Sequence, residues 1–211
     1  MKVLKSSLFA SILAIAFIGV SCSNSGSESS EVVEETTVEE VVGVTGQFNV
    51  SPENSHLKWK GKKVTGKHYG SIDIASGSVE FENGSLTSAN FTVDMTSLTV
   101  EDIEDEENNA KLKGHLMSDD FFDVENHNTA TLLVTSVDGN TVTADLTIRG
   151  TTNPVTFPIE VEETEDAVVV SGKLDVDRTL YNVRYGSGKF FEDLGDKMIY
   201  DTFNLDFKLK L

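Results

Sequence analysis

Cys22 is the residue of this chain whose position most directly predicts a covalent chemistry. It is the only cysteine among 211 residues, so it cannot form an internal disulfide. It follows two lysines, an apolar stretch over residues 8–20 and a short run ending in Ser21, the order of an export signal. The stretch is too short to span a bilayer, and small residues directly before the lone cysteine resemble a bacterial lipoprotein signal. We therefore interpret residues 1–21 as a lipoprotein signal peptide and Cys22 as acylated, with chains such as palmitate. An ordinary secretory peptide followed by a free thiol is the alternative.

No arrangement of side chains typical of an enzyme is found in the sequence. With Cys22 acylated, no cysteine nucleophile remains, and no serine lies in a Gly-x-Ser-x-Gly elbow. The acidic run over residues 101–107 lacks the glycine and the alternating ligands of a calcium loop. The histidines lack the close spacing of zinc ligands: His56, His68, His115 and His127. We therefore predict no catalytic residue, no metal and no cofactor.

Two arginines are candidates for contacting a polar or phosphate head group. Arg178 and Arg184 lie six positions apart in a segment rich in glycine and aromatic residues. A guanidinium makes bidentate contacts with such anions. Both arginines could equally be structural partners for the many carboxylates of the chain.

The charge of the chain excludes some partners. It has 17 Lys and Arg against 35 Asp and Glu, a net charge of −18, and loss of the two lysines of the leader would make it −20. Such a surface repels phosphate backbones, so we expect no nucleic-acid partner. It also discourages binding to anionic lipid, so membrane attachment would rest on the acyl chains at Cys22. Residues 22–46, rich in Glu and free of basic residues, are expected to form an extended tether.

The elements that follow the tether are mostly expected to be strands. Apolar and polar residues alternate over 55–64, 85–95, 129–137, 141–149, 155–161, 168–177 and 202–211, and a long strand with a bend near residues 76–77 is expected over 71–82. Asn83-Gly84 and Asp138-Gly139 predict hairpins, and residues 150–154 are expected to turn the chain. Pro158 suggests a poorly paired or edge segment.

One segment differs from this pattern. Residues 108–113 have the composition of a short helix, with Leu112 and Leu116 on one face. Ser118 and Asp119 are expected to end it, because their side chains compete for the backbone. The following Phe121 and Phe122 are costly to leave in water. We interpret this segment as a helix and an aromatic plug over the open end of a β structure, or as a connecting loop whose phenylalanines complete the core.

About eight strands joined by short turns can close on themselves. We expect an all-β fold: an eight-stranded antiparallel up-and-down β-barrel with one short helix between strands 3 and 4, since closure removes exposed edges. A barrel of this size is filled by side chains or holds one small ligand. A two-sheet sandwich is the structural alternative.

Three segments in register resemble the YceI-like family. They are His115 to Asp123, Leu146 to Phe157 and Asp177 to Ser187, and the resemblance covers about residues 47–211. It implies an exported, lipocalin-like barrel that binds polyisoprenoid lipids in its interior. Family members often carry Tyr-Pro soon after the plug, where this chain has His127-Asn128. The predicted anchor and tether also differ from plain secreted members.

These observations together predict a non-catalytic lipoprotein of the bacterial cell envelope, periplasmic or surface-exposed, that carries an isoprenoid or another long apolar lipid. A ligand-free interaction module with a packed core is the alternative, an enzyme acting on a lipid is a third hypothesis, and a homodimer is left open. The residues expected to line the cavity are Trp59, Phe91, Met95, Phe121, Phe122, Leu146, Phe157, Tyr181, Tyr185, Phe203 and Phe207.

Overall fold

The structure is a computed structural model that describes residues 43–164 and 166–211. The predicted signal peptide, Cys22 and the tether up to residue 42 lie outside the described residues. Every described strand, the α-helix and the hydrophobic core fall within residues 43–211. A chain that begins at residue 23 therefore keeps every described strand, the α-helix and the described core.

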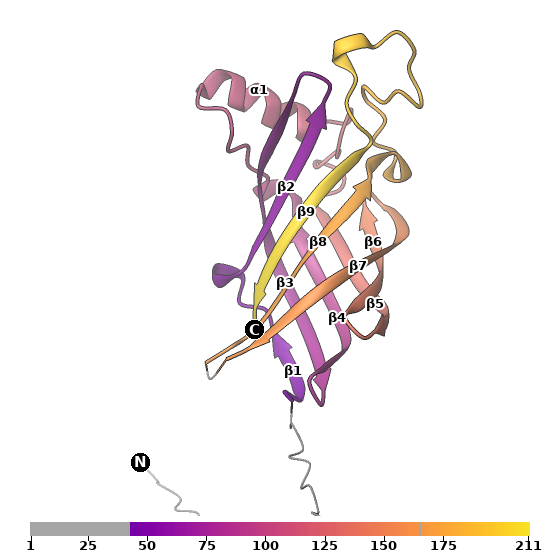
Figure 1. Cartoon of the computed structure of the whole chain (residues 1–211). Coiled ribbons are helices and arrows are strands. Elements are labelled where there is room, and N and C mark those ends of the chain that lie inside the picture. Colours follow the sequence, from indigo (N-terminus) through magenta and orange to yellow (C-terminus); the bar gives the residue numbers. More distant parts are fainter. Residues whose placement is uncertain (1–42, 165) are drawn as a thin grey trace, which may run out of the picture. The chain divides into compact units, whose positions relative to one another are not determined.

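The described chain folds into nine antiparallel strands (Figure 1). Alternation of apolar and polar residues gives each long strand one inward and one outward face. The strands are β1 (Gly46–Asn49), β2 (His56–Lys63), β3 (Gly66–Glu82), β4 (Ser85–Asp94), β5 (Thr129–Asp138), β6 (Thr141–Ile148), β7 (Thr151–Glu163), β8 (Val168–Asp177) and β9 (Thr202–Lys210).

Eight of these strands form a closed barrel, as the sequence predicts. Each of β2 to β9 pairs with its neighbours in the chain, and β9 returns to pair with β2, with Trp59 opposite Leu205 and Leu57 opposite Phe207. Closure satisfies the edges of both terminal strands, and the two-sheet alternative is excluded. The short β1 was not predicted as a strand. It pairs with the second half of β3, where β2 no longer does.

The turns agree with the sequence at some positions and correct it at others. Asn83 and Gly84 both have positive φ, as a type I′ hairpin requires. The turn expected over residues 150–154 is instead the pair Arg149-Gly150, both with positive φ, and β7 starts directly at Thr151. The hairpin predicted at Asp138-Gly139 joins β5 and β6. Its tight turn is the pair Gly139-Asn140, since Asp138 still pairs with Thr141.

The expectation for Pro158 is corrected in part. Pro158 does not lie on an edge strand. It ends the pairing of β7 with β6, and β7 pairs with β8 from Ile159 onward, so the missing N–H of proline falls where β7 changes partner.

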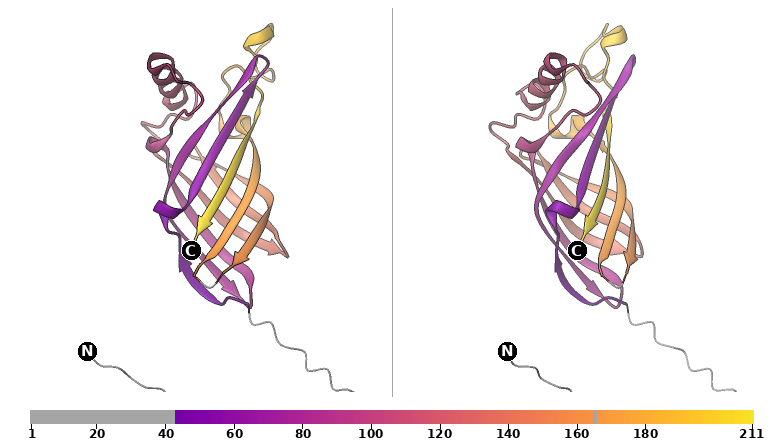
Figure 2. Two further views of the ribbon diagram at one scale, coloured as in Figure 1. Left: turned by 60° about the vertical axis from the view of Figure 1, so that its left-hand side comes forward. Right: turned by 90° about the vertical axis from the view of Figure 1, so that its left-hand side faces the viewer.

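The helix α1 (Glu106–Met117) is longer than predicted and lies between β4 and β5, the third and fourth strands of the barrel. It begins where the Asp105 carboxylate accepts a hydrogen bond from the Asn108 N–H at 2.9 Å, a typical N-cap. It ends where the Ser118 hydroxyl donates to the His115 carbonyl. Figures 1 and 2 show α1, the β2–β3 hairpin and the segment before β9 at one end of the barrel, and the start of β1 at the other.

Candidate functional site

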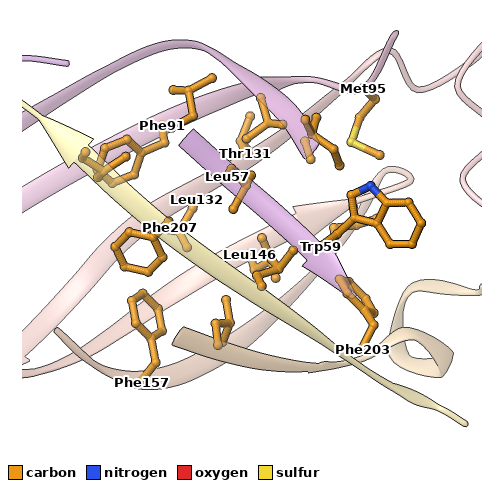
Figure 3. A pocket seen from close by; sticks show the side chains of 18 of the residues that line it. Leu57, Trp59, Phe91, Met95, Thr131, Leu132, Leu146, Phe157, Phe203 and Phe207 are labelled. Atoms are coloured by element: carbon orange, nitrogen blue, oxygen red, sulfur yellow. The ribbon is translucent and has the colours of Figure 1, made fainter. Parts of the chain in front are cut away.

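The interior of the barrel contains an elongated apolar cavity of about 180 Å³. Its lining comes from all eight barrel strands, from the plug after α1 and from the segment before β9. Among the described residues that line it, Arg178 is the one charged side chain. Figure 3 shows Phe91, Phe157 and Phe207 at one end, Trp59 and Phe203 at the other, and Leu146 between them.

Nine of the eleven predicted lining residues lie around this cavity. They come from separate strands and the plug because the inward faces of a closed barrel converge on its axis. Whether these side chains contact a ligand stays a prediction. The nine are Trp59, Phe91, Met95, Phe121, Phe122, Leu146, Phe157, Phe203 and Phe207.

Tyr181 and Tyr185 do not line the cavity, which corrects the expectation for both. Tyr181 is buried in the turn that follows β8, with 1% of its surface exposed. Tyr185 is 46% exposed and packs its ring against His115 of α1, with the centroids 4.5 Å apart. Both belong to the segment over residues 178–201, which reaches the cavity with Arg178, Ile199 and Tyr200 but not with these two tyrosines.

Glycines in the strands make room for two of the aromatic lining residues. A Cβ at Gly77 would come within 2.5 Å of the Phe91 ring, and a Cβ at Gly172 within 2.7 Å of the Phe207 ring. Each phenylalanine lies directly opposite its glycine on the neighbouring strand. A glycine therefore allows a large ring to lie flat against the barrel wall, which leaves the axis open.

A second glycine contact orients Trp59. The indole Nε1 donates to the Thr99 carbonyl at 3.0 Å, which fixes the ring at the edge of the cavity. Gly70 lies beside this bond, and a Cβ there would approach the Thr99 oxygen to 2.0 Å. The segment after β4 can reach the tryptophan only because residue 70 has no side chain.

The aromatic plug lies at the end of the cavity next to α1. Phe121 is buried and packs edge-on against His115, with the centroids 5.1 Å apart. Phe122 is half-buried and meets Phe203 of β9 at 6.3 Å. Both phenylalanines line the cavity, so the prediction of a plug at this end is confirmed.

Arg178 organises this end of the barrel, and its donors are not free for a head group. With only 3% of its side chain exposed, the guanidinium donates to the carbonyls of Val183, Tyr185, Ile199 and Tyr200 at 2.9–3.1 Å. It also lies 3.6 Å from the Asp201 carboxylate. Arg178 therefore has the structural role that the sequence left open. The expectation that it contacts a head group is corrected. Burial lowers the pKa of Arg178, and the charges of Asp201 and Asp177 oppose that shift.

The other candidate arginine is exposed and outside the cavity. Arg184 lies 4.7 Å from the centre of the Phe190 ring and donates to the Asn182 side chain. An arginine that the sequence analysis missed does more at this end. Arg149, in the β6–β7 turn, donates to the carbonyls of Phe121 and Asn182 at 2.9 and 3.1 Å and so links the plug to the 178–201 segment. Its position directly before the turn glycine was the available signal.

Polar groups surround Arg178 on its outer side. Lys189 lies 2.7 Å from the Asp177 carboxylate and 3.7 Å from that of Asp201. Burial would raise the pKa of Asp177, but hydrogen bonds from Lys189 and Thr179 lower it below its usual value. Burial, with the charge of Asp177, raises the pKa of the neighbouring Tyr181 to about 12.

The part of the chain that the structure describes offers no cluster of three or more His, Cys, Asp or Glu side chains suited to a metal ion. Its one α-helix, α1, has 12 residues, and none of the described helices is long and apolar enough to cross a membrane.

The chain belongs to the YceI-like family, whose domain model matches residues 48–211. Two solved structures share the fold. A protein of Burkholderia cenocepacia, BcnA, is 24% identical, with a TM-score of 0.60, and the match covers 77% of this chain and 99% of that one. A polyisoprenoid-binding domain from Saccharophagus degradans, implicated in plant cell wall breakdown, is 17% identical, with a TM-score of 0.54 and coverage of 79% and 98%. None of the curated proteins matches the chain.

Proposed function

We propose that this chain is a non-catalytic lipid-binding protein of the bacterial cell envelope, which holds an isoprenoid or similar long apolar chain inside its barrel. The observation that carries the proposal is the cavity, whose lining is mainly apolar. Its one charged member among the described residues, Arg178, has its donors occupied. A cavity of about 150 Å³ lined by such residues stays dry and takes up apolar guests. The relative from Saccharophagus degradans, described as polyisoprenoid-binding, supports the same class of ligand.

The interior suits a chain more than a head group. Transfer of each methylene from water into a dry cavity yields about 0.8 kcal/mol, so a long apolar chain gains affinity without polar contacts. A cavity of about 180 Å³ would admit only part of such a chain. Half-buried lining residues at the plug, Phe122 and Phe203, are those that could change rotamer to admit more.

The same proposal includes the anchor. Acyl chains on Cys22 would hold the protein to a membrane, periplasmic or surface-exposed, with residues 23–45 as the spacer before β1. A single acyl chain binds a membrane only reversibly, whereas two or more make a stable anchor.

Mass spectrometry of the whole protein, purified in mild detergent, tests both parts. Under native conditions we expect an added mass matching one prenyl-type lipid per barrel, which disappears on denaturation. A second, covalent mass should remain on the peptide that begins at Cys22. A native mass equal to that of the acylated chain alone would favour the alternative, an interaction module with a packed core.

A further inference from the structure

We propose that the end of the barrel formed by the β2–β3 hairpin and the 184–200 segment docks onto an anionic lipid bilayer, so that the cavity opens toward the membrane. This inference rests on the proposed function, because a protein that takes up a long lipid must present its cavity to the source of that lipid. It concerns a surface to which neither the family nor the anchor assigns a role.

Exposed apolar side chains gather at this end. Among residues 43–164 and 166–211, eight large hydrophobic residues are strongly exposed; seven of them lie in residues 64–69 and 180–200, and Leu133 on β5 is the exception. We call four of them the apolar rim: Val64 at 45% exposure, Phe190 at 45%, Phe191 at 50% and Tyr200 at 47%. Such a cluster marks an interaction site, and aromatic residues of this kind favour the bilayer interface.

The rim is one connected structure. The Val64 N–H donates to the Met198 carbonyl at 3.2 Å, and the Tyr200 N–H donates to the Lys62 carbonyl at 3.0 Å. The N–H groups of Phe190 and Phe191 both donate to the carbonyl of the fully buried Ser187 at 3.1 Å. The turn that presents the two phenylalanines is joined to the residues before β9, because the Ile199 N–H donates to the Gly186 carbonyl at 2.8 Å.

The rim also marks the mouth of the cavity. Tyr200 is nearly half exposed and at the same time lines the cavity. Gly61 of β2 lines it too, and a Cβ built on Gly61 would meet nothing within 4 Å, so the space beside this residue is open. At the opposite end the lining residues Val79, Leu86 and Leu209 are buried. A lipid chain would enter past Tyr200 rather than past the far end.

The local charge complements an anionic surface although the whole chain carries −18. Residues 58–69 hold five lysines and no acidic residue, and the 184–200 segment holds three basic and three acidic side chains. The lysines nearest the hairpin tip, Lys62, Lys63 and Lys67, are exposed. The acidic run over residues 101–107 begins beside β3, where the Glu101 N–H donates to the Tyr69 carbonyl at 2.9 Å, and continues into α1 at Glu106. The β2 side would therefore face the bilayer, with the α1 side turned away.

Co-sedimentation with vesicles tests this surface, using the chain without residues 1–22 so that neither the leader nor an acyl chain contributes. At low salt we expect binding to phosphatidylglycerol vesicles and much weaker binding to phosphatidylcholine. Lys62→Gln/Lys63→Gln should lower partitioning onto the anionic vesicles about 25-fold. Phe190→Ser/Phe191→Ser should lower it about tenfold or more on both lipids.

Matched variants keep the test specific. Lys208→Gln/Lys210→Gln on β9 removes the same charge at the far end, and Leu133→Ser removes the one strongly exposed hydrophobic residue outside the two segments. Both should change partitioning less than twofold. Vesicle binding that is absent in the parent, or equal in rim and control variants, would overturn the proposal. So would loss of self-association in the rim variants without any vesicle binding, which would make the rim a contact between copies.

Binding of a soluble fluorescent prenyl probe separates this inference from the proposed function. The rim variants should bind the probe as the parent does, because the rim lies outside the cavity except for Tyr200. A parent that binds vesicles but no probe would refute the lipid-carrying function and leave the docking surface standing. A parent that binds the probe but no vesicles would refute the docking surface and leave the lipid-carrying function standing.

Discussion

Arg178 shows that the type of a residue does not by itself determine its role. A guanidinium in an aromatic-rich segment is a reasonable head-group ligand, and the sequence also left a structural role open. It could not reveal that four carbonyls from residues 183–200 converge on this side chain. Such convergence depends on how the 178–201 segment folds back, which no local pattern encodes.

Replacement of Arg178 should therefore unfold this end rather than weaken ligand binding alone. We expect Arg178→Gln to lower the free energy of unfolding by about 3 kcal/mol or more, because it leaves the Asp201 charge and several buried carbonyls without their donor. Arg184→Gln, at an exposed position, should stay within about 0.5 kcal/mol of the parent. Urea unfolding of both variants is the measurement. Equal effects would show that Arg178 is not structural.

Replacement of Tyr181, unlike that of Arg178, is expected not to lower the free energy of unfolding. Within residues 43–164 and 166–211 its buried hydroxyl has no hydrogen-bond partner. Tyr181→Phe should leave the free energy of unfolding unchanged or raise it by about 1 kcal/mol, since an unpaired polar atom leaves the interior. A loss of more than about 1 kcal/mol would mean that the hydroxyl is bonded in solution.

The raised pKa of Tyr181 predicts how the stability of the protein changes at high pH. Its folded value of about 12 lies above the unfolded value of about 10, so the stability from the neutral ring is complete below pH 10 and is lost as the pH rises toward 12. The loss of stability between these pH values should be smaller in Tyr181→Phe than in the parent.

At the scale of elements, the segment after β4 is tied to β3 by charge. The His68 Nδ1 lies 2.8 Å from the Asp102 carboxylate, and the Tyr69 N–H donates to the same carboxylate at 3.0 Å. Burial would raise the pKa of Asp102, but these hydrogen bonds and the charge of His68 lower it. Since the folded pKa is depressed, this stability is present above the unfolded pKa of about 3.9 and is lost as the pH falls through the folded value.

Acid unfolding of an Asp102→Asn variant measures how much the Asp102 carboxylate contributes to stability. The variant should be less stable than the parent at pH 7, and the difference should shrink as the pH falls from about 4 to 2. Unfolding midpoints at several pH values give both quantities. A difference that stays constant with pH would mean that the charge of Asp102 does not stabilise the segment.

The pairing of β9 with β2 can be tested by a designed disulfide in the chain without residues 1–22. Lys58 lies directly opposite Asp206, and opposed residues of antiparallel strands have Cα atoms about 4.5–5.5 Å apart, within reach of a disulfide. Lys58→Cys/Asp206→Cys should oxidise readily. Lys58→Cys/Lys208→Cys is the control, because diagonal positions are about 7–8 Å apart. Equal oxidation of both pairs would contradict this register.

At the scale of the whole molecule, the alternation of the strands and the strong hairpin dipeptides were enough to predict the barrel, its closure and the place of its helix. The inward face of each strand follows from a period of two, so nine of the predicted residues lie around the cavity, and their contact with a ligand stays a prediction. Tyr181 and Tyr185 were not, because no period governs the 178–201 segment. The glycines opposite Phe91 and Phe207 were also missed, since their effect depends on a register between different strands.

The net charge illustrates a similar limit. A total of −18 argues against anionic lipid partners, yet the fold brings a lysine-rich hairpin and exposed aromatic residues to the mouth of the cavity. A sum over the chain contains no information on where charges lie. Only the folded barrel, with its two distinct ends, shows that the lysines of the β2–β3 hairpin lie beside the apolar rim.

Titration of a fluorescent prenyl probe into the parent and into Leu146→Trp tests the central claim most directly. Leu146 lies midway along the cavity (Figure 3), so an indole there should fill the path of the chain. We predict saturable binding of one probe per barrel by the parent, at least tenfold weaker binding by Leu146→Trp, and a change in stability of less than about 1 kcal/mol. Absence of saturable binding by the parent, with a loss of about 1–3 kcal/mol in the variant from overpacking, would contradict the account.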